Sequence, residues 1–217
     1  DAAEEHGEDL IELATRDADV PLSALGHVQA AALGSWFQAL QQQADVFFSS
    51  PFVRAYQTCQ AIATENQICV DERLREKEFG ILDRFTKKGI LNKFPELAEQ
   101  RRLVGKFYFR PPGGESWCDV ILRLRSVVEL LRRDYAGRQV VIVSHQVIVN
   151  CLRYLLERLD EERILAIDRE ADVPNCSITE YIGARDGMKL VRANFTEHLR
   201  EAQAPITRGS DQPAGPR

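Results

Sequence analysis

Four consecutive β-branched residues, Val140–Val143, show no alternation between apolar and polar positions. This pattern predicts a strand buried on both faces, as in a parallel sheet that helices cover on both sides. The apolar spacing of residues 147–156 predicts a helix directly after it. His145 therefore follows the carboxyl end of a predicted core strand, where open α/β sheets bind ligands. The alternative is that His145 only caps the next helix.

Two shorter apolar runs, at residues 45–49 and 68–70, predict further strands. The first leads into a predicted helix with Ser50 as its N-cap and Pro51 as its first residue, where a missing N–H is tolerated. Ser23 is the predicted N-cap of an earlier helix, whose apolar positions keep helical spacing as far as Leu40.

The second half of the chain continues the alternation of helices and strands. Residues 117–133 carry a helical pattern, preceded by Ser116 and Asp119 at the spacing of a capping pair. Residues 177–182 and 189–192, with a turn between them, predict a terminal hairpin. Together these elements predict an α/β fold, a three-layer α/β/α sandwich with a central, mostly parallel sheet.

One domain is expected over residues 1–200. Within it, residues 81–112 combine scattered helical pieces with a basic-aromatic patch, which indicates a lid-like insertion over the sheet edge. Residues 201–217 are rich in Pro, Gly and small polar residues, and this composition predicts a disordered tail.

Composition narrows the possible partners. A net charge of −5 argues against nucleic acid, whose partners usually carry a basic face. No apolar run approaches the ~20 residues that span a bilayer, and the N-terminus has no signal-peptide pattern, so no membrane partner is expected. Five cysteines without Cys-x-x-Cys spacing predict reduced thiols in a cytoplasmic protein, with no metal site and no cofactor. The oligomeric state is left open.

Arg54 falls in the first turn of the helix predicted after Ser50, where a cation opposes the helix dipole by ~0.3–1 kcal/mol. A surface salt bridge could offset this cost. If an anion docks at the helix N-terminus instead, the guanidinium and the free N–H groups point at one target. Arg54 and His145 would then meet at one sheet edge as a phosphate pocket.

Several carboxylates and cations are further candidates. Glu76 follows the strand at residues 68–70, and a phosphate-ester enzyme needs an acid to protonate the leaving oxygen; a solvated loop carboxylate is the alternative. Glu115 follows two glycines that allow close backbone approach and is a candidate for the site rim. Lys106 and Arg110 could meet a negatively charged substrate from the lid, or form only a solvated face.

Five blocks of the sequence resemble motifs of the histidine phosphatase superfamily, also called phosphoglycerate mutase-like, in the family's order. Residues 49–58 resemble its Ser-Ser-Pro-x-x-Arg-Ala-x-Gln-Thr signature, and residues 74–80 its acid loop. Residues 113–116 resemble its Gly-Glu-Ser turn, and residues 141–145 its second-histidine strand. Residues 19–30 resemble the stretch before its first long helix, so the likeness covers roughly residues 19–200.

The resemblance implies a phosphatase that hydrolyses a phosphate monoester through a transient phosphohistidine. By motif, Arg54 would bind the transferring phosphoryl group and His145 would stabilise its charge. Glu76 would act as general acid and then as base for the attacking water. A small phosphorylated molecule is the expected partner. The residues predicted to bind this substrate are Glu115, Ser116, Lys106 and Arg110.

One family motif is missing. The family's nucleophile is the histidine of an Arg-His-Gly motif at the end of its first strand, and no such motif occurs here. His6 is not taken as a substitute, because no apolar strand precedes it and Glu5 replaces the arginine. The nucleophile is therefore expected upstream of Asp1; a degenerate member without a nucleophile is the alternative. Gln146 also replaces a glycine that is common in the family.

The main rival to a phosphatase is a non-catalytic phosphate-binding or interaction protein derived from this family. A phosphoglycerate-mutase-type phosphotransferase is less favoured, because the segment after residue 116 lacks the Pro-Tyr-Trp region expected of glycolytic mutases. A Ser-His-Asp hydrolase is disfavoured, since no Gly-x-Ser-x-Gly elbow is present.

Overall fold

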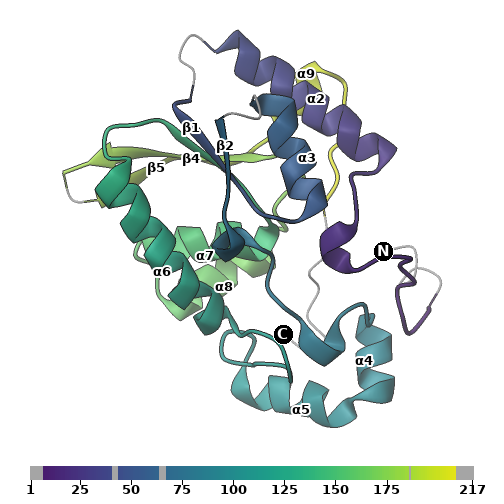
Figure 1. Ribbon diagram of the computed structural model, residues 1–217. Helices are drawn as coiled ribbons and strands as arrows, with labels where there is room; N and C mark the ends of the chain where they lie inside the picture. Colours follow the sequence, from purple (N-terminus) through teal and green to yellow (C-terminus); the bar gives the residue numbers. More distant parts are fainter. Residues whose placement is uncertain (1–6, 41–43, 64–66, 186, 209–217) are drawn as a thin grey trace.

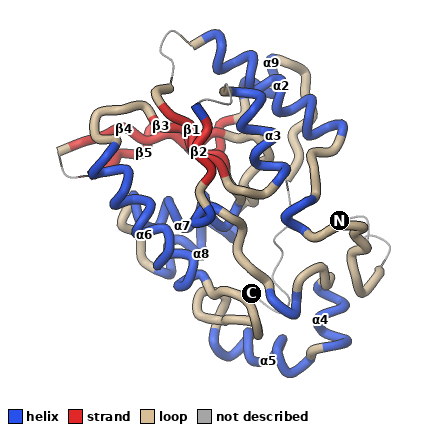
Figure 2. The backbone as a smooth tube through the Cα atoms, viewed as in Figure 1, coloured by secondary structure: helices blue, strands red, loops and turns tan. Residues whose placement is uncertain are grey.

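The computed structural model describes residues 7–40, 44–63, 67–185 and 187–208 (Figure 1). At its centre lies a parallel sheet with the order β2-β1-β3, and a separate antiparallel pair, β4-β5, forms a second sheet (Figure 2). These elements confirm the strands predicted from the apolar runs. Their bounds are β1 Val46–Ser49, β2 Ile68–Val70, β3 Val140–Val143, β4 Ile178–Ala184 and β5 Gly187–Phe195.

Helices cover both faces of the parallel sheet (Figure 1), as expected for a three-layer α/β/α sandwich. Helices α2, α3 and α9 form one layer, and helices α6, α7 and α8 form the other. The bounds are α2 Ala24–Ala39, α3 Val53–Ile62, α9 Glu197–Glu201, α6 Trp117–Asp134, α7 Gln146–Leu156 and α8 Glu161–Glu170.

The most buried strand of the parallel sheet is β1, because apolar side chains leave it on both faces. Phe48 packs in the main core with residues of α6 and α7, and Phe47 packs with Cys59 of α3. By contrast, every residue of β3 is only partly buried. Val140 and Ile142 pack against the core of α6 and α7, and Val141 and Val143 pack against the core that contains Cys59 of α3. The prediction that Val140–Val143 is covered on both faces is therefore confirmed, although its burial is incomplete. Among the described residues β3 pairs with β1 alone, so one edge of β3 is unpaired and its side chains are less buried than those of β1.

Two short helices, α4 (Lys87–Lys93) and α5 (Pro95–Val104), stand apart from the sheet in the lower part of Figure 1. They make up the helical part of the predicted lid-like insertion. Phe85, just before α4, contacts Phe94, the residue between the two helices, with ring centroids 5.1 Å apart. Whether this unit acts as a lid stays a prediction.

The described N-terminal residues run along this helical unit and take no part in the parallel sheet. Thr86 Oγ1 donates a hydrogen bond to the Glu8 carbonyl oxygen at 2.7 Å. Gly89 is needed for this approach, since a Cβ there would lie 1.9 Å from the Asp9 carbonyl oxygen. The close packing ties the start of the chain to α4.

Residues 201–208, which the composition assigned to a disordered tail, pack against α2. The Gln29 side chain donates to the Pro205 carbonyl oxygen at 2.7 Å, and Ala204 is buried in a small core with Ala32 and Leu199. The rest of the predicted tail lies outside the described residues. None of the helices in the described part of the chain is long and apolar enough to cross a bilayer.

Candidate active site

The register of the parallel sheet brings together the ends of β1 and β3. Ser49 pairs with Val143, and the Ser50 N–H donates to the Val143 carbonyl oxygen at 3.0 Å. One step further on, His145 Nε2 and Ser50 Oγ form a hydrogen bond of 2.8 Å. Two motifs that lie far apart in the sequence therefore meet at the carboxyl edge of the sheet.

Helix α3 begins later than predicted. Its N-cap is Phe52, and the assignment of Ser50 as N-cap and Pro51 as first helical residue is wrong. Phe52 has extended backbone, with ψ at 132°, so the helix starts only after it and Ser50 lies two residues further outside. Its Oγ accepts a hydrogen bond from the Phe52 N–H at 3.2 Å and stays within reach of His145.

His145 is the N-cap residue of α7, but its side chain makes no capping hydrogen bond. The ring instead packs edge-on against Phe52, with centroids 5.0 Å apart. Burial, followed by the charges of Arg54 and Arg123, lowers the pKa of His145 to about 3. The imidazole is therefore neutral at pH 7.

Arg54 lies in the first turn of α3, as predicted, and Asp17 holds its guanidinium. Nη1 donates to the Asp17 carbonyl oxygen at 2.7 Å, and Nη2 donates to Oδ2 at 3.0 Å. The guanidinium carbon also lies 4.9 Å from the centre of the Phe52 ring, the ring that contacts His145. The guanidinium donors that the motif assigns to a phosphoryl group are thus already bonded to Asp17.

Glu76 lies in the loop that follows β2 at the same edge of the sheet. Its Oε1 accepts a hydrogen bond from the Lys77 N–H at 2.8 Å. After burial, the charge of Glu76 is the next cause that raises the pKa of Cys151 in α7.

The Glu115 carboxylate faces the acid loop, residues 74–80. Its carboxylate accepts hydrogen bonds from Arg123 at 2.9 and 3.0 Å, from Arg75 at 3.2 Å and from the Glu78 N–H at 3.1 Å. Burial raises its pKa, but the bonds from Arg123 and Glu78 outweigh this and leave the pKa below its ordinary value. The carboxylate is therefore ionised at neutral pH, and substrate contact by Glu115 stays a prediction.

Ser116 caps α6 in the predicted way. Its Oγ accepts from the Asp119 N–H at 3.2 Å, and the Asp119 carboxylate accepts from the Ser116 N–H at 2.8 Å, a reciprocal capping box. The observed contacts give Ser116 a role in starting the helix. A role in substrate binding stays a prediction.

Carboxylates pair with both cations predicted to bind substrate. Lys106 Nζ lies 2.8 Å from Asp168 Oδ2 of α8. The Arg110 guanidinium contacts both oxygens of Asp119, and these hydrogen bonds are the first cause that lowers the pKa of Asp119 to about 2. Both cations join neighbouring elements, and substrate binding by either stays a prediction.

Sequence reasoning missed three residues that shape this site: Arg123, Asp17 and Ser144. Arg123 left a usable signal, because it lies on α6 one turn after buried Val120 and beside buried Leu124. A charge on the flank of an apolar stripe needs a partner. Asp17 and Ser144 carry no comparable pattern. Within the described ranges, no group of three or more His, Cys, Asp or Glu side chains could hold a metal ion.

Comparisons with known proteins identify one family. The sequence profile of the histidine phosphatase superfamily (branch 1) matches residues 6–196. The matched span thus includes the segment His6-Gly7-Glu8, of which His6 lies outside the described residues.

Individual relatives carry several activities in their names. A 2,3-bisphosphoglycerate-dependent phosphoglycerate mutase of Sinorhizobium fredii is 32% identical over 168 residues, which cover 73% of this chain and 77% of that protein. A 6-phosphofructo-2-kinase/fructose-2,6-bisphosphatase of Caenorhabditis elegans is 33% identical over 141 residues, 64% of this chain but 30% of that longer protein. The solved complex of mycobacterial glucosyl-3-phosphoglycerate phosphatase with inorganic phosphate superposes with a TM-score of 0.69 at 27% identity. It covers 88% of this chain and 95% of that one.

Proposed function

Because the chain belongs to the histidine phosphatase superfamily, we propose that it hydrolyses a phosphate monoester through a phosphohistidine intermediate. The observation that carries the proposal is the meeting of Ser50, Arg54 and His145 around the Phe52 ring. An anion at this sheet edge would meet a guanidinium, an imidazole and a hydroxyl group. Glu76, in the loop at the same edge, would supply an acid for the leaving oxygen.

The reaction would proceed in two steps. A histidine nitrogen attacks phosphorus, the bond to the ester oxygen breaks, and Glu76 gives that oxygen a proton. Glu76 then accepts a proton from a water molecule, which attacks the phosphohistidine and releases inorganic phosphate and free histidine. Arg54 binds the phosphoryl oxygens throughout, and a hydrogen bond from His145 stabilises the charge that develops on them.

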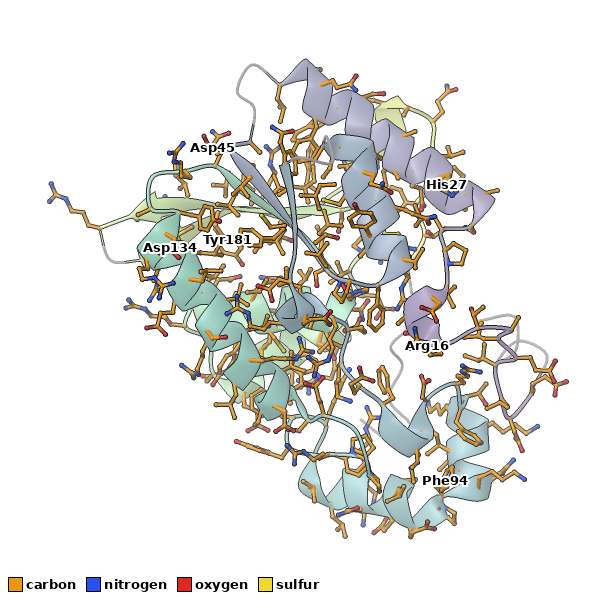
Figure 3. The ribbon with its side chains drawn as sticks, in the orientation of Figure 1. Arg16, His27, Asp45, Phe94, Asp134 and Tyr181 are labelled. Carbon is orange, nitrogen blue, oxygen red and sulfur yellow. The ribbon has the colours of Figure 1, made fainter. Side chains whose placement is uncertain are left out.

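The chain contains four histidines, and each can be considered as the nucleophile. His27 lies exposed on α2 (Figure 3), on the helix layer that flanks the sheet. His198 is 2% exposed and bonded through Nε2 to the Cys176 carbonyl oxygen at 2.9 Å. Neither lies at the Ser50–His145 contact, so the structure gives no support to either as the nucleophile.

We keep the prediction that the nucleophile lies upstream of Asp1. Within the described residues, the outer edge of β3 has no strand neighbour, and β3 leads directly to His145. A strand paired along this edge would end beside His145, as an in-line nucleophile requires. His6 is the competing candidate, since the family profile includes it.

The test compares the 217-residue chain with the protein expressed from its natural start codon, both assayed on p-nitrophenyl phosphate. The account predicts turnover by the longer protein and only phosphate binding by the shorter one. Equal turnover by both would rule out an upstream nucleophile. In that case His6→Asn, with exposed His27→Asn as the matched control, shows whether His6 carries the phosphoryl group.

A phosphotransferase is the second candidate, which the 32% identity to the S. fredii mutase favours. Incubation with a phosphoglycerate and 2,3-bisphosphoglycerate separates the two activities. Isomer exchange without net release of inorganic phosphate would support a mutase, and phosphate release would support a phosphatase. Phosphate binding without either reaction, in the longer protein, would support a non-catalytic phosphate-binding protein.

The proposed partner is a small phosphorylated molecule, in keeping with a site built from single side chains, Ser50, Arg54 and His145, near the strand ends. A cytoplasmic location is also part of the proposal, because all five cysteines are free thiols in the structure.

A further inference from the structure

Hydrogen bonds to backbone carbonyl oxygens hold residues 73–76, where the acid loop (residues 74–80) begins. The guanidinium of Arg123, from α6, donates to the carbonyl oxygens of residues 73, 75 and 76, at 3.0 Å for residue 75 and 3.3 Å for residue 76. Ser144 Oγ donates to the carbonyl oxygen of residue 74 at 2.7 Å. Four successive carbonyl groups are thus bonded, three of them by a single side chain.

Glu115 holds Arg123 in the orientation that this contact requires. Arg123 Nε and Nη2 donate to the two carboxylate oxygens of Glu115 at 2.9 and 3.0 Å. The two side chains are 11% and 13% exposed. A pair so well shielded from water keeps its geometry, because loss of either partner leaves a buried charge unpaired.

Glu115 also ties the far end of the loop. The Glu78 N–H donates to Glu115 Oε2 at 3.1 Å, and the Glu115 N–H donates to the Glu78 carbonyl oxygen at 2.9 Å. The backbones approach closely here, since a Cβ at Gly114 would lie 2.7 Å from the Glu78 carbonyl oxygen. Glu76 therefore lies in a loop that is bonded on both sides of it.

We propose that Arg123 and Glu115 are positioning residues for Glu76, which set the place of its carboxyl group relative to the leaving oxygen. The inference rests on the proposed phosphomonoester hydrolysis, in which Glu76 is the general acid. Proton transfer needs a heavy-atom separation of about 2.6–3.2 Å, and a displacement of ~1 Å can cost ~10²-fold in rate. Without Arg123, the carbonyl oxygens of residues 73, 75 and 76 would lose these bonds, and only the bond from Ser144 to residue 74 would remain.

The first arm of the test uses Arg123→Lys and the near-isosteric Glu115→Gln. Lysine keeps the charge but lacks the planar fork that reaches several carbonyls. On an alkyl phosphate, the phosphorylation rate of each variant, measured in the burst, should fall roughly 10–100-fold, a large part of a general-acid effect. On p-nitrophenyl phosphate, whose leaving group needs no proton, the burst rate should fall less than about threefold. Steady-state kcat is not compared, because Glu76 also acts as base in the second step, which both esters share. A direct substrate contact by Glu115 would instead raise KM for both esters equally.

The matched control is Arg153→Lys. Arg153 pairs with Glu157 at 2.8 Å, and these side chains are 10% and 17% exposed, so burial and pairing resemble those of Arg123 and Glu115. This pair joins residues within and at the end of α7 and makes no contact with the acid loop. Its replacement should leave the ratio of the two ester activities unchanged.

The second arm is amide hydrogen exchange over residues 73–79, which needs no catalysis. Exchange there should accelerate about tenfold or more in Arg123→Lys, because local opening becomes easier, while Arg153→Lys leaves the loop unchanged. Equal losses of the phosphorylation burst rate on both esters, or unchanged loop exchange in Arg123→Lys and Glu115→Gln, would overturn the inference. If the unmodified longer protein hydrolyses neither ester, the proposed function fails, and loop exchange alone then decides whether the Arg123 bonds hold the loop.

Discussion

The two halves of the candidate site are held in different ways. On the acid side, Arg123 and Glu115 are 11% and 13% exposed and bond the loop around Glu76. On the phosphate side, the side chains of Arg54 and Asp17 are 28% and 40% exposed. Their shortest hydrogen bond runs from Arg54 to the backbone carbonyl oxygen of Asp17, in the short turn before α2. One ion pair lies inside the protein, and the other lies at the solvent boundary.

This difference separates fixed from exchangeable contacts. Breaking a buried pair leaves a charge without water or partner, which typically costs ~3–5 kcal/mol. An exposed pair typically contributes ~0–1 kcal/mol, because water and salt screen it. On the proposed function, a phosphate dianion would replace the Asp17 carboxylate on Arg54, whereas the buried Arg123–Glu115 pair would stay intact. The acid half is built for position, and the phosphate half for exchange.

The largest effect is expected from Glu76→Gln, which keeps the shape of the side chain but cannot deliver a proton. In the longer protein, turnover of alkyl phosphates should fall about 10²–10⁴-fold, the usual size of general acid–base catalysis. The loss on p-nitrophenyl phosphate should be much smaller during the phosphorylation burst. Stopped-flow measurement with both esters checks this, and exposed Glu72→Gln in the same segment is the control. Equal losses on both esters would contradict the acid role.

Arg54→Lys should have the next largest effect. Lysine retains the charge but cannot grip two phosphoryl oxygens with one planar group. The expected loss in kcat/KM corresponds to about 2–4 kcal/mol, as for removal of one oxyanion donor. Arg16→Lys, at a more exposed arginine paired with Asp19, is the matched control. A change below about threefold, or ~0.6 kcal/mol, would make Arg54 a surface residue.

The pKa of His145 predicts a stability effect of intermediate size. Because burial lowers that pKa from 6.5 to about 3, the unfolded chain binds more protons between these values. The free energy of unfolding therefore falls as pH falls through this window, and above it His145 contributes no pH dependence. Between pH 7 and pH 5 the contribution is about 2 kcal/mol.

Urea unfolding of the chain and of His145→Asn at both pH values isolates this contribution. The difference between the two proteins also removes the effect of His198, whose pKa burial likewise lowers. Phosphate in the buffer should reduce the pH dependence of the unmodified chain, because an anion stabilises the charged imidazole. An identical pH dependence in both proteins would show that His145 titrates normally.

The smallest effect is expected from Asp17→Asn, which removes the carboxylate that holds Arg54. Phosphate should bind roughly twofold to fivefold more tightly, in line with the ~0–1 kcal/mol of an exposed pair. Asp19→Asn is the matched control, because Asp19 lies in the same short turn and pairs with Arg16. Titration calorimetry with inorganic phosphate measures both. Weaker binding in Asp17→Asn would mean that Asp17 orients Arg54 for the ligand.

Local patterns predicted much of this arrangement. Short apolar runs identified β1 and β2, and the Ser116–Asp119 spacing identified the start of α6. Strand-end reasoning placed Arg54 and His145 at one edge, and both contact Phe52 in the structure. These predictions succeeded because each depends on a few neighbouring residues and on the shared direction of parallel strands.

Long-range contacts were beyond the same reasoning. The apolar run at Val140–Val143 gave no information about which strands pair with it, so the edge position of β3 was missed. Asp17 meets Arg54 across 37 positions of sequence, and Lys106 meets Asp168 across 62. Such ion pairs follow from the final packing, and a single sequence shows only two separate charges.

The central claim is that phosphate displaces Asp17 from Arg54 while the Arg123–Glu115 pair stays in place. The most direct test is a crystal structure of the chain with inorganic phosphate. The account predicts phosphate oxygens within hydrogen-bond distance of the Arg54 guanidinium and the His145 ring, with the Arg54–Asp17 side-chain contact broken. The Arg123–Glu115 pair should be unchanged. A phosphate bound elsewhere, or an intact Arg54–Asp17 contact at saturating phosphate, would contradict it.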